Sequence, residues 1–116
     1  MENFDINHRK QDSVIIFTVT GYFTQPAAER LRADANVLLT PEKAVVVIDL
    51  SKVPVINSPG VAGLLDLVLH VLDDLDGAVF LVGLDRLKNQ VLTMAGIIPL
   101  ATSVETIEEA LRTAKI

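Results

Sequence analysis

Residues 44–82 read AVVVIDLSKVPVINSPGVAGLLDLVLHVLDDLDGAVFLV, and their pattern decides the fold. The stretch opens with an apolar strand, residues 44–50, whose start shows no polar alternation, as is typical of a strand buried on both faces. A helix predicted from about Pro59 to Leu75 follows, and Gly77 suits the position just past its end. Residues 78–82 form a second apolar strand. We therefore expect a right-handed parallel βαβ unit at the centre of a sheet.

The residues before this unit predict an N-terminal hairpin and one helix. Residues 13–20 are rich in β-branched side chains and residues 3–9 alternate in polarity, so these segments are expected to pair antiparallel around a turn at residues 10–12. Leucine and alanine recur at helical spacing from Pro26 to Leu39, which predicts an amphipathic helix. Pro41 then prevents its continuation.

The C-terminal third predicts two helices and a last short strand. The first helix spans Arg86 to Ala95 and ends at Gly96. Residues 97–101 are assigned to an edge strand because of Pro99. Thr102–Glu105 match a capping box that would start the final helix. The apolar stripe of that helix comprises Val104, Ile107, Leu111 and Ala114.

Length and composition exclude several classes of protein. A chain of 116 residues fits one domain, residues 1–116, with an α/β fold of about five mixed strands in a single layer and about four helices. The net charge of −5 and the lack of a basic stripe argue against nucleic-acid binding. The most apolar span, residues 61–75, carries charged and polar side chains that argue against membrane insertion. With no cysteine and no secretory signal at residues 1–5, a cytoplasmic location is expected.

Candidates for catalysis or metal binding are few. His8 and His70 lie in different predicted elements, so each is interpreted as a surface or packing residue, and no metal, cofactor or catalytic residue is predicted. Asp73, Asp74 and Asp76 form a small acidic cluster at a helix end, where a solvated edge is expected rather than a cation site. Gly60 and Gly63 resemble a dinucleotide-binding loop only in part, which leaves a small nucleotide-binding or hydrolytic domain as an alternative of another class.

Residues 57–60, Asn-Ser-Pro-Gly, join the first apolar strand to the long helix. One interpretation makes Ser58 the N-cap and Pro59 the first helical residue, a common way to start a helix. In the other, Ser58 is a phosphorylation site at the positive end of the helix, where free N–H groups would stabilise the phosphate.

The long helix carries more apolar side chains than one buried stripe needs. Positions 61, 64, 65, 68 and 72 form a stripe that can pack on the sheet, which leaves Ala62, Leu67 and Leu69 over. These residues either contact a partner protein or lie under a neighbouring helix, and the sequence leaves both possibilities open.

The order of elements and three local segments resemble the STAS family, the domain shared by sulfate transporters and anti-sigma factor antagonists. Gly21 resembles a turn glycine of the family, and Val91–Ile97 resembles its late segment. Val47–Val61 resembles the family signature, an apolar strand with D-L-S followed by D-S-S/T-G-L. This chain departs from the signature by carrying Asn57 for the aspartate and Pro59 for the second serine or threonine.

The resemblance implies an anti-sigma factor antagonist, a regulatory module without catalysis. Its partner would be an anti-sigma factor with serine-kinase activity that phosphorylates Ser58 and is thereby released. The resemblance also implies a partner surface made of the turn, the loop and the start of the long helix. With the apolar helix residues added, this surface comprises Gly21, Tyr22, Phe23, Asn57, Ser58, Pro59, Gly60, Val61, Ala62 and Leu67. A STAS subunit of a membrane transporter is the alternative within the family, and the oligomeric state is left open between monomer and weak dimer.

Overall fold

The computed structural model describes residues 3–39 and 44–114, and Pro41, predicted to stop the first helix, lies outside them. The strands are β1 (Phe4–Gln11), β2 (Val14–Gly21), β3 (Val45–Lys52), β4 (Ala78–Val82) and β5 (Thr102–Val104). The helices are α1 (Gln25–Leu38), α2 (Ser58–Leu69), the π-helical turn η1 (His70–Asp74), α3 (Arg86–Met94) and α4 (Ile107–Ala114).

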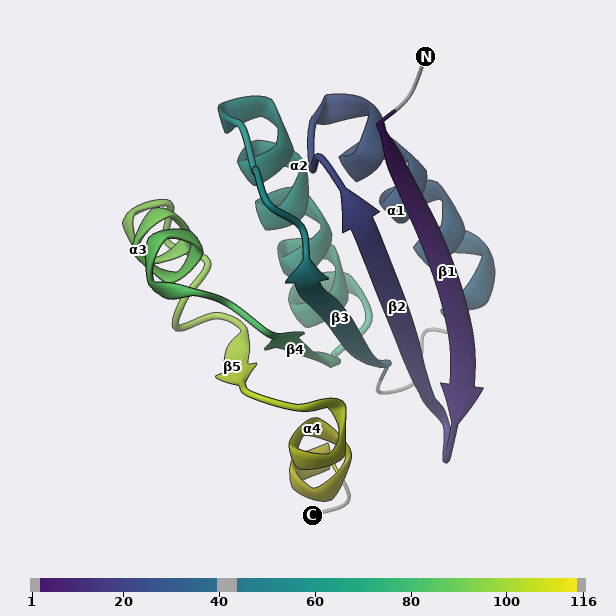
Figure 1. The fold of residues 1–116 in the computed structure, drawn as a ribbon. Coiled ribbons are helices and arrows are strands. Elements are labelled where there is room, and N and C mark those ends of the chain that lie inside the picture. Colours follow the sequence, from purple (N-terminus) through teal and green to yellow (C-terminus); the bar gives the residue numbers. More distant parts are fainter. Residues whose placement is uncertain (1–2, 40–43, 115–116) are drawn as a thin grey trace.

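The strands form one mixed sheet in the order β1-β2-β3-β4-β5 (Figure 1). β1 runs antiparallel to β2, and all other neighbouring pairs are parallel. The predicted α/β fold, with a parallel βαβ core and an N-terminal hairpin, is confirmed.

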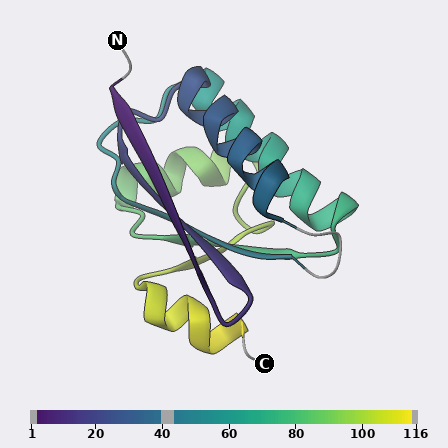
Figure 2. The ribbon, with the colours of Figure 1, turned by 90° about the vertical axis from the view of Figure 1, so that its right-hand side faces the viewer.

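Helices cover the two faces of this sheet unequally. Figure 2 shows α1 and α2 on one face and α4 on the other. The larger core lies under α1 and α2, and the smaller core lies under α4. Large members of the first core include Phe17, Leu31, Ile48 and Leu64, and those of the second include Ile16, Val47, Phe80 and Leu111. As a result α2 packs against both the sheet and α1, which a single apolar stripe does not reveal.

The hairpin turn lies at Asp12 and Ser13 rather than at residues 10–12. Both residues have left-handed backbone, with φ of 52° and 70°. Two-residue hairpin turns need this conformation because it matches the twist of the flanking strands. The prediction was wrong because β1 continues through Gln11, which pairs with Val14.

The C-terminal region differs most from the sequence prediction. Residues 97–101 are not a strand, because residues 98–100 turn and the last strand is β5. Val104 belongs to β5, not to the stripe of α4. The helix starts later than predicted, and Thr106 Oγ1 accepts a hydrogen bond of 3.0 Å from the N–H of Glu109. The capping motif of α4 is therefore Thr106–Glu109, which has the same S/T-x-x-E spacing as the predicted one.

The long helix predicted to end near Leu75 is present, but its last turn is the π-helical η1. Gly77 follows it and donates its N–H to Val71 O at 2.8 Å. Across residues 3–39 and 44–114, no helix has the length and apolar character needed to span a membrane.

Candidate functional site

Two segments that are far apart in the sequence meet beside the start of α2. The N–H of Phe23 donates to Val55 O at 2.9 Å, and the N–H of Asn57 donates to Phe23 O at 3.2 Å. Phe23 and Ile56 thereby form an isolated parallel bridge. The turn after β2 and the connection from β3 to α2 are thus brought together, as the resemblance to the STAS family implied.

Gly21 sets the path of the turn that carries Tyr22. Its φ is +95°, and a Cβ there would lie 2.2 Å from Asn3 O. The N–H of Tyr22 donates to the same oxygen at 2.9 Å. Only glycine accepts this conformation and this close approach without strain. The Tyr22 side chain is left 47% exposed beside the loop.

The cap of α2 is Asn57, so the interpretation of Ser58 as N-cap is wrong. Asn57 Oδ1 accepts a hydrogen bond of 2.9 Å from the N–H of Gly60, and Ser58 is the first residue of the helix. An asparagine at N-cap makes the same bond to N3 as a serine would. The exposed Ser58 side chain is therefore not needed for the cap.

Few free N–H groups surround Ser58, contrary to the expectation from the sequence. Pro59 has no N–H, and the N–H of Gly60 is bonded to the Asn57 side chain. The N–H of Val61 donates to Asn57 O at 2.9 Å. A phosphate on Ser58 would thus gain mainly from the positive end of the helix rather than from several direct N–H bonds.

Gly60 is a packing residue beneath this site. A Cβ at Gly60 would lie 2.2 Å from Phe23 O, which lets α2 start directly against the turn. A Cβ at Gly63 would lie 2.4 Å from the Cβ of Ala28, so this glycine lets α1 and α2 approach closely. Both glycines therefore have packing roles in the fold.

Of the residues predicted to form the partner surface, some are buried and others are exposed. Phe23 and Gly60 are buried, and Leu67 is 1% exposed. The predictions that Phe23, Gly60 and Leu67 face a partner are wrong. Phe23 lies in the larger core, Gly60 packs against Phe23, and α2 at Leu67 is covered by α1 as well as by the sheet. Gly21 and Val61 are half-buried. The exposed members are Tyr22, Asn57, Ser58, Pro59 and Ala62, and these five are called the switch surface below.

An apolar groove adjoins the switch surface and was missed from the sequence. It lies between residues 54–56 and α3, and its volume is about 130 Å³. Val55 is 49% exposed at its rim and Leu87 is 68% exposed. The spacing of Leu87 and Val91 on α3 was the available signal, since residues four apart share one helix face.

The start of α3 forms a second capped helix end next to this groove. Asp85 Oδ1 accepts a hydrogen bond of 2.8 Å from the N–H of Lys88, and the Lys88 ammonium lies 3.0 Å from Asp85 Oδ2. The Lys88 N–H, and after it the Lys88 ammonium, stabilise the carboxylate and lower the pKa of Asp85 below its ordinary value.

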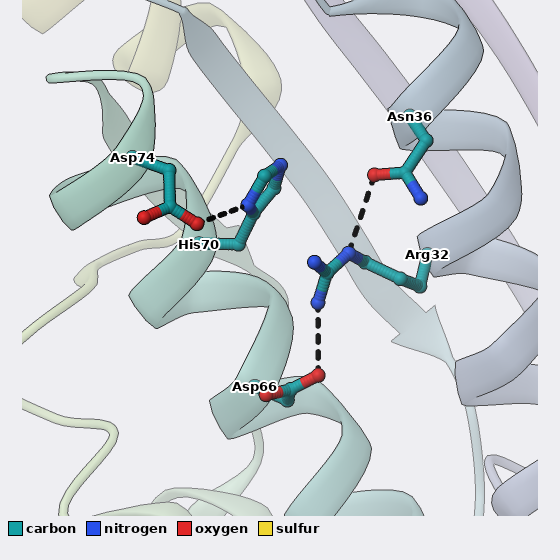
Figure 3. Close-up of polar contacts among 5 residues, drawn as sticks. All are labelled: Arg32, Asn36, Asp66, His70 and Asp74. Atoms are coloured by element: carbon teal, nitrogen blue, oxygen red, sulfur yellow. Dashed lines mark hydrogen bonds and ion pairs between the residues drawn. The ribbon is translucent and has the colours of Figure 1, made fainter.

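A second cleft, of about 700 Å³ and lined by both polar and apolar residues, lies between α1 and α2. Among the residues that line this cleft, Arg32 bonds Asp66 at 2.8 Å and Asn36 at 3.3 Å (Figure 3). Outside the cleft, on η1, His70 lies 2.7 Å from Asp74. These contacts are exposed, and exposed ion pairs contribute little stability. His70 is half-buried and its ring is bonded to Asp74, which fits the surface or packing role expected for it.

His8 and the acidic residues Asp73, Asp74 and Asp76 are all exposed, as expected for surface positions. His8 is exposed, and its ring packs at a tilt against Phe17 with 6.3 Å between centroids. Within the described residues, no group of three or more His, Cys, Asp or Glu side chains is placed to hold a metal ion.

Fold and site define a small α/β domain whose most distinctive feature is an exposed serine on a capped helix start. The chain matches the model of the STAS domain over residues 5–112, and it belongs to the STAS domain family. A search of curated protein sequences finds no match.

Solved structures share the fold at low sequence identity. A candidate anti-sigma factor antagonist from Thermotoga maritima has a TM-score of 0.82 at 16% identity, over 96% of this chain and 95% of that one. A sulfate transporter family protein from Wolinella succinogenes has a TM-score of 0.77 at 23% identity, over 92% and 88%. The Bacillus cell fate determinant SpoIIAA in its phosphorylated form has a TM-score of 0.71 at 17% identity, over 95% and 99%.

Proposed function

We propose that this chain is an anti-sigma factor antagonist, a cytoplasmic binding module switched by phosphorylation of Ser58. The observation that carries the proposal is the position of Ser58: it is exposed, it is the first residue of α2, and its hydroxyl is not needed for the cap that Asn57 makes. Membership of the STAS family and the likeness to antagonist folds support it.

In its unmodified form the switch surface binds an anti-sigma factor and frees the sigma factor. Tyr22, Pro59 and Ala62 supply exposed apolar area around Ser58, while Gly21 and Gly60 fix the backbone beneath. Because both contributing segments are hydrogen-bonded to each other, the surface is ordered before the partner arrives. A pre-organised surface loses less entropy on binding.

Phosphorylation acts on the partner rather than on the fold. A phosphate adds about −1.5 to −2 charges at pH 7. At the start of α2 this charge is tolerated within the domain, because the helix end is positive and Asn57 is neutral. Against an apolar partner surface the same charge would lose its hydration, and the complex would dissociate. The kinase is the partner, so this chain carries out no catalysis itself.

The experiment that tests this function uses purified chain, ATP and an anti-sigma factor kinase from the same genome. After incubation, mass spectrometry of the chain without substitutions is expected to find phosphate on Ser58. The Ser58→Ala substitution is expected to abolish this phosphorylation. Ser103→Ala is the matched control, because Ser103 is an exposed serine on β5 away from α2. Phosphate on another residue, or none with every kinase of this class, would contradict the proposal.

A STAS subunit of a membrane transporter is the second candidate. It is favoured by the likeness to the Wolinella sulfate transporter family protein, which at 23% has a higher identity than the 16% of the antagonist from Thermotoga. Stoichiometric co-purification with a permease or transport ATPase, unaffected by Ser58→Asp, would favour it. Co-purification with an anti-sigma factor, lost in Ser58→Asp, would favour the antagonist.

A further inference from the structure

A buried ammonium group stands next to the connection that carries Ser58. Lys88 is 8% exposed, and among the described residues it is the one polar or charged residue in the buried class. Burying a charge is costly unless it is paired and hydrogen-bonded. The hydrogen-bond partners of this ammonium therefore indicate its structural role.

Lys88 ties α3 to the connection between β3 and α2. Its Nζ donates to Val53 O at 2.7 Å and to Asp85 Oδ2 at 3.0 Å. Val53 is the first residue after β3 and is itself 1% exposed. The bond to Val53 spans 35 residues of sequence, so it fixes tertiary structure rather than local helix geometry.

The same connection is tied at its other end by the turn after β2. Phe23 bonds Val55 O and the N–H of Asn57. The segment from Val53 to Asn57 is thus held from α3 on one side and from Phe23 on the other. Between the two ties, residues 54–56 form one wall of the apolar groove, and Lys88 lines the same groove.

We propose that Lys88 is a positioning residue that holds residues 53–57 in the conformation presenting Ser58 at the surface. The Lys88 ammonium holds the start of this segment through its hydrogen bond to Val53 O. Asp85 orients the ammonium and neutralises its charge. The consequence for partner binding rests on the proposed function, whereas the effect on the connection does not.

The first experiment measures amide hydrogen exchange in Lys88→Met, which keeps the aliphatic stem and removes the donor. The amides of Phe23 and Asn57 are expected to exchange about tenfold faster or more relative to central β3 amides, since a charge-assisted bond is lost. Lys10→Met is the matched control, because Lys10 is an exposed lysine on β1. Relative rates within about twofold of the unmodified chain would overturn the positioning role.

A measurement on the unmodified chain covers the case in which Lys88→Met does not fold. NMR detects scalar coupling across a hydrogen bond, here between Lys88 Nζ and the carbonyl carbon of Val53. Coupling between these two atoms is expected. Its absence, together with rapid exchange of the ammonium protons, would show that the hydrogen bond from Lys88 to Val53 is not formed.

The functional arm compares phosphorylation of Ser58 in Lys88→Met and Lys10→Met. A rate about tenfold lower in Lys88→Met alone is expected, whereas equal rates in the two variants would overturn the presenting role. If the unmodified chain is not phosphorylated, the proposed function fails, and the exchange and coupling measurements still decide the role of Lys88.

Discussion

The starts of α2 and α3 are built alike but differ in charge. Each follows a strand, and each has a cap whose side-chain oxygen accepts from the third helical N–H, at 2.9 Å for Asn57 and 2.8 Å for Asp85. The α2 start has a neutral amide, an exposed serine and a proline. The α3 start has a carboxylate that is already paired with the Lys88 ammonium.

This difference shows why only one of the two ends suits a charge switch. The positive end of a helix favours a negative charge by about 0.3–1 kcal/mol. At α3 that negative charge is supplied by Asp85, whereas the cap of α2 is neutral, so a charge at Ser58 would be the one at that end. The asparagine that departs from the family signature thus leaves the cap of α2 uncharged.

The largest expected effect separates the body of α2 from its start. Leu67→Ala should lower the free energy of unfolding by about 2–5 kcal/mol, because a fully buried leucine leaves a cavity. Leu69→Ala is the matched control, since Leu69 is 38% exposed, and it should cost less than about 1 kcal/mol. Urea unfolding measures both, and similar costs would mean that α2 is not covered on its α1 side.

The next effect tests the close contact under the α2 start. Gly60→Ala should lower the free energy of unfolding by about 1–3 kcal/mol, because the added Cβ would lie 2.2 Å from Phe23 O. Ala62→Ser, on the exposed side of the same turn, should change it by less than about 0.5 kcal/mol. A Gly60→Ala variant as stable as the unmodified chain would show that α2 does not start against the turn.

A smaller effect tests which residue caps α2. Asn57→Ala should cost about 1 kcal/mol of stability through loss of the bond to the Gly60 N–H. Ser58→Ala should be near neutral, because its hydroxyl is not the cap acceptor. Thermal unfolding of the two variants checks this order, and the reverse order would return the cap to Ser58.

The smallest effect concerns pH and distinguishes the two caps directly. The pKa of Asp85 is lowered in the folded state, so its contribution is present above about pH 4, the unfolded value, and is lost as pH falls through the folded pKa. The stability difference between the unmodified chain and Asp85→Asn should therefore shrink below about pH 4. The difference for Asn57→Ala should stay constant over the same range, since an amide does not titrate. A pH-independent difference for Asp85→Asn would contradict the Lys88 pairing.

Much of the fold was predictable because the pattern of apolar residues in 44–82 is clear. Two apolar strands around one long helix leave few topologies, and the hairpin before them follows from alternation. The strand predicted at residues 97–101 was wrong, because periodicity alone does not distinguish a short apolar run in a strand from one in packed turns.

The position of Ser58 at the start of α2 was predictable, but the residue that caps the helix was not. The handover from β3 to α2 and the family signature placed Ser58 correctly at the helix start. Asn and Ser are both good caps, so adjacent residues competed and the choice needed coordinates. The burial of Leu67 was not predictable, because it depends on how many elements pack on α2. Lys88 was missed because a lysine in a polar helix is normally exposed, and its acceptor is a distant carbonyl.

The most direct test of the central claim is the affinity of the purified chain for its anti-sigma factor, measured by titration calorimetry with Ser58→Asp and Ser58→Asn. The two variants match in size and differ in charge. Ser58→Asp should bind at least about tenfold more weakly than the unmodified chain, which is about 1.4 kcal/mol, while Ser58→Asn should stay within about threefold. Equal affinities for all three chains, or equal losses in both variants, would contradict a charge switch at the start of α2.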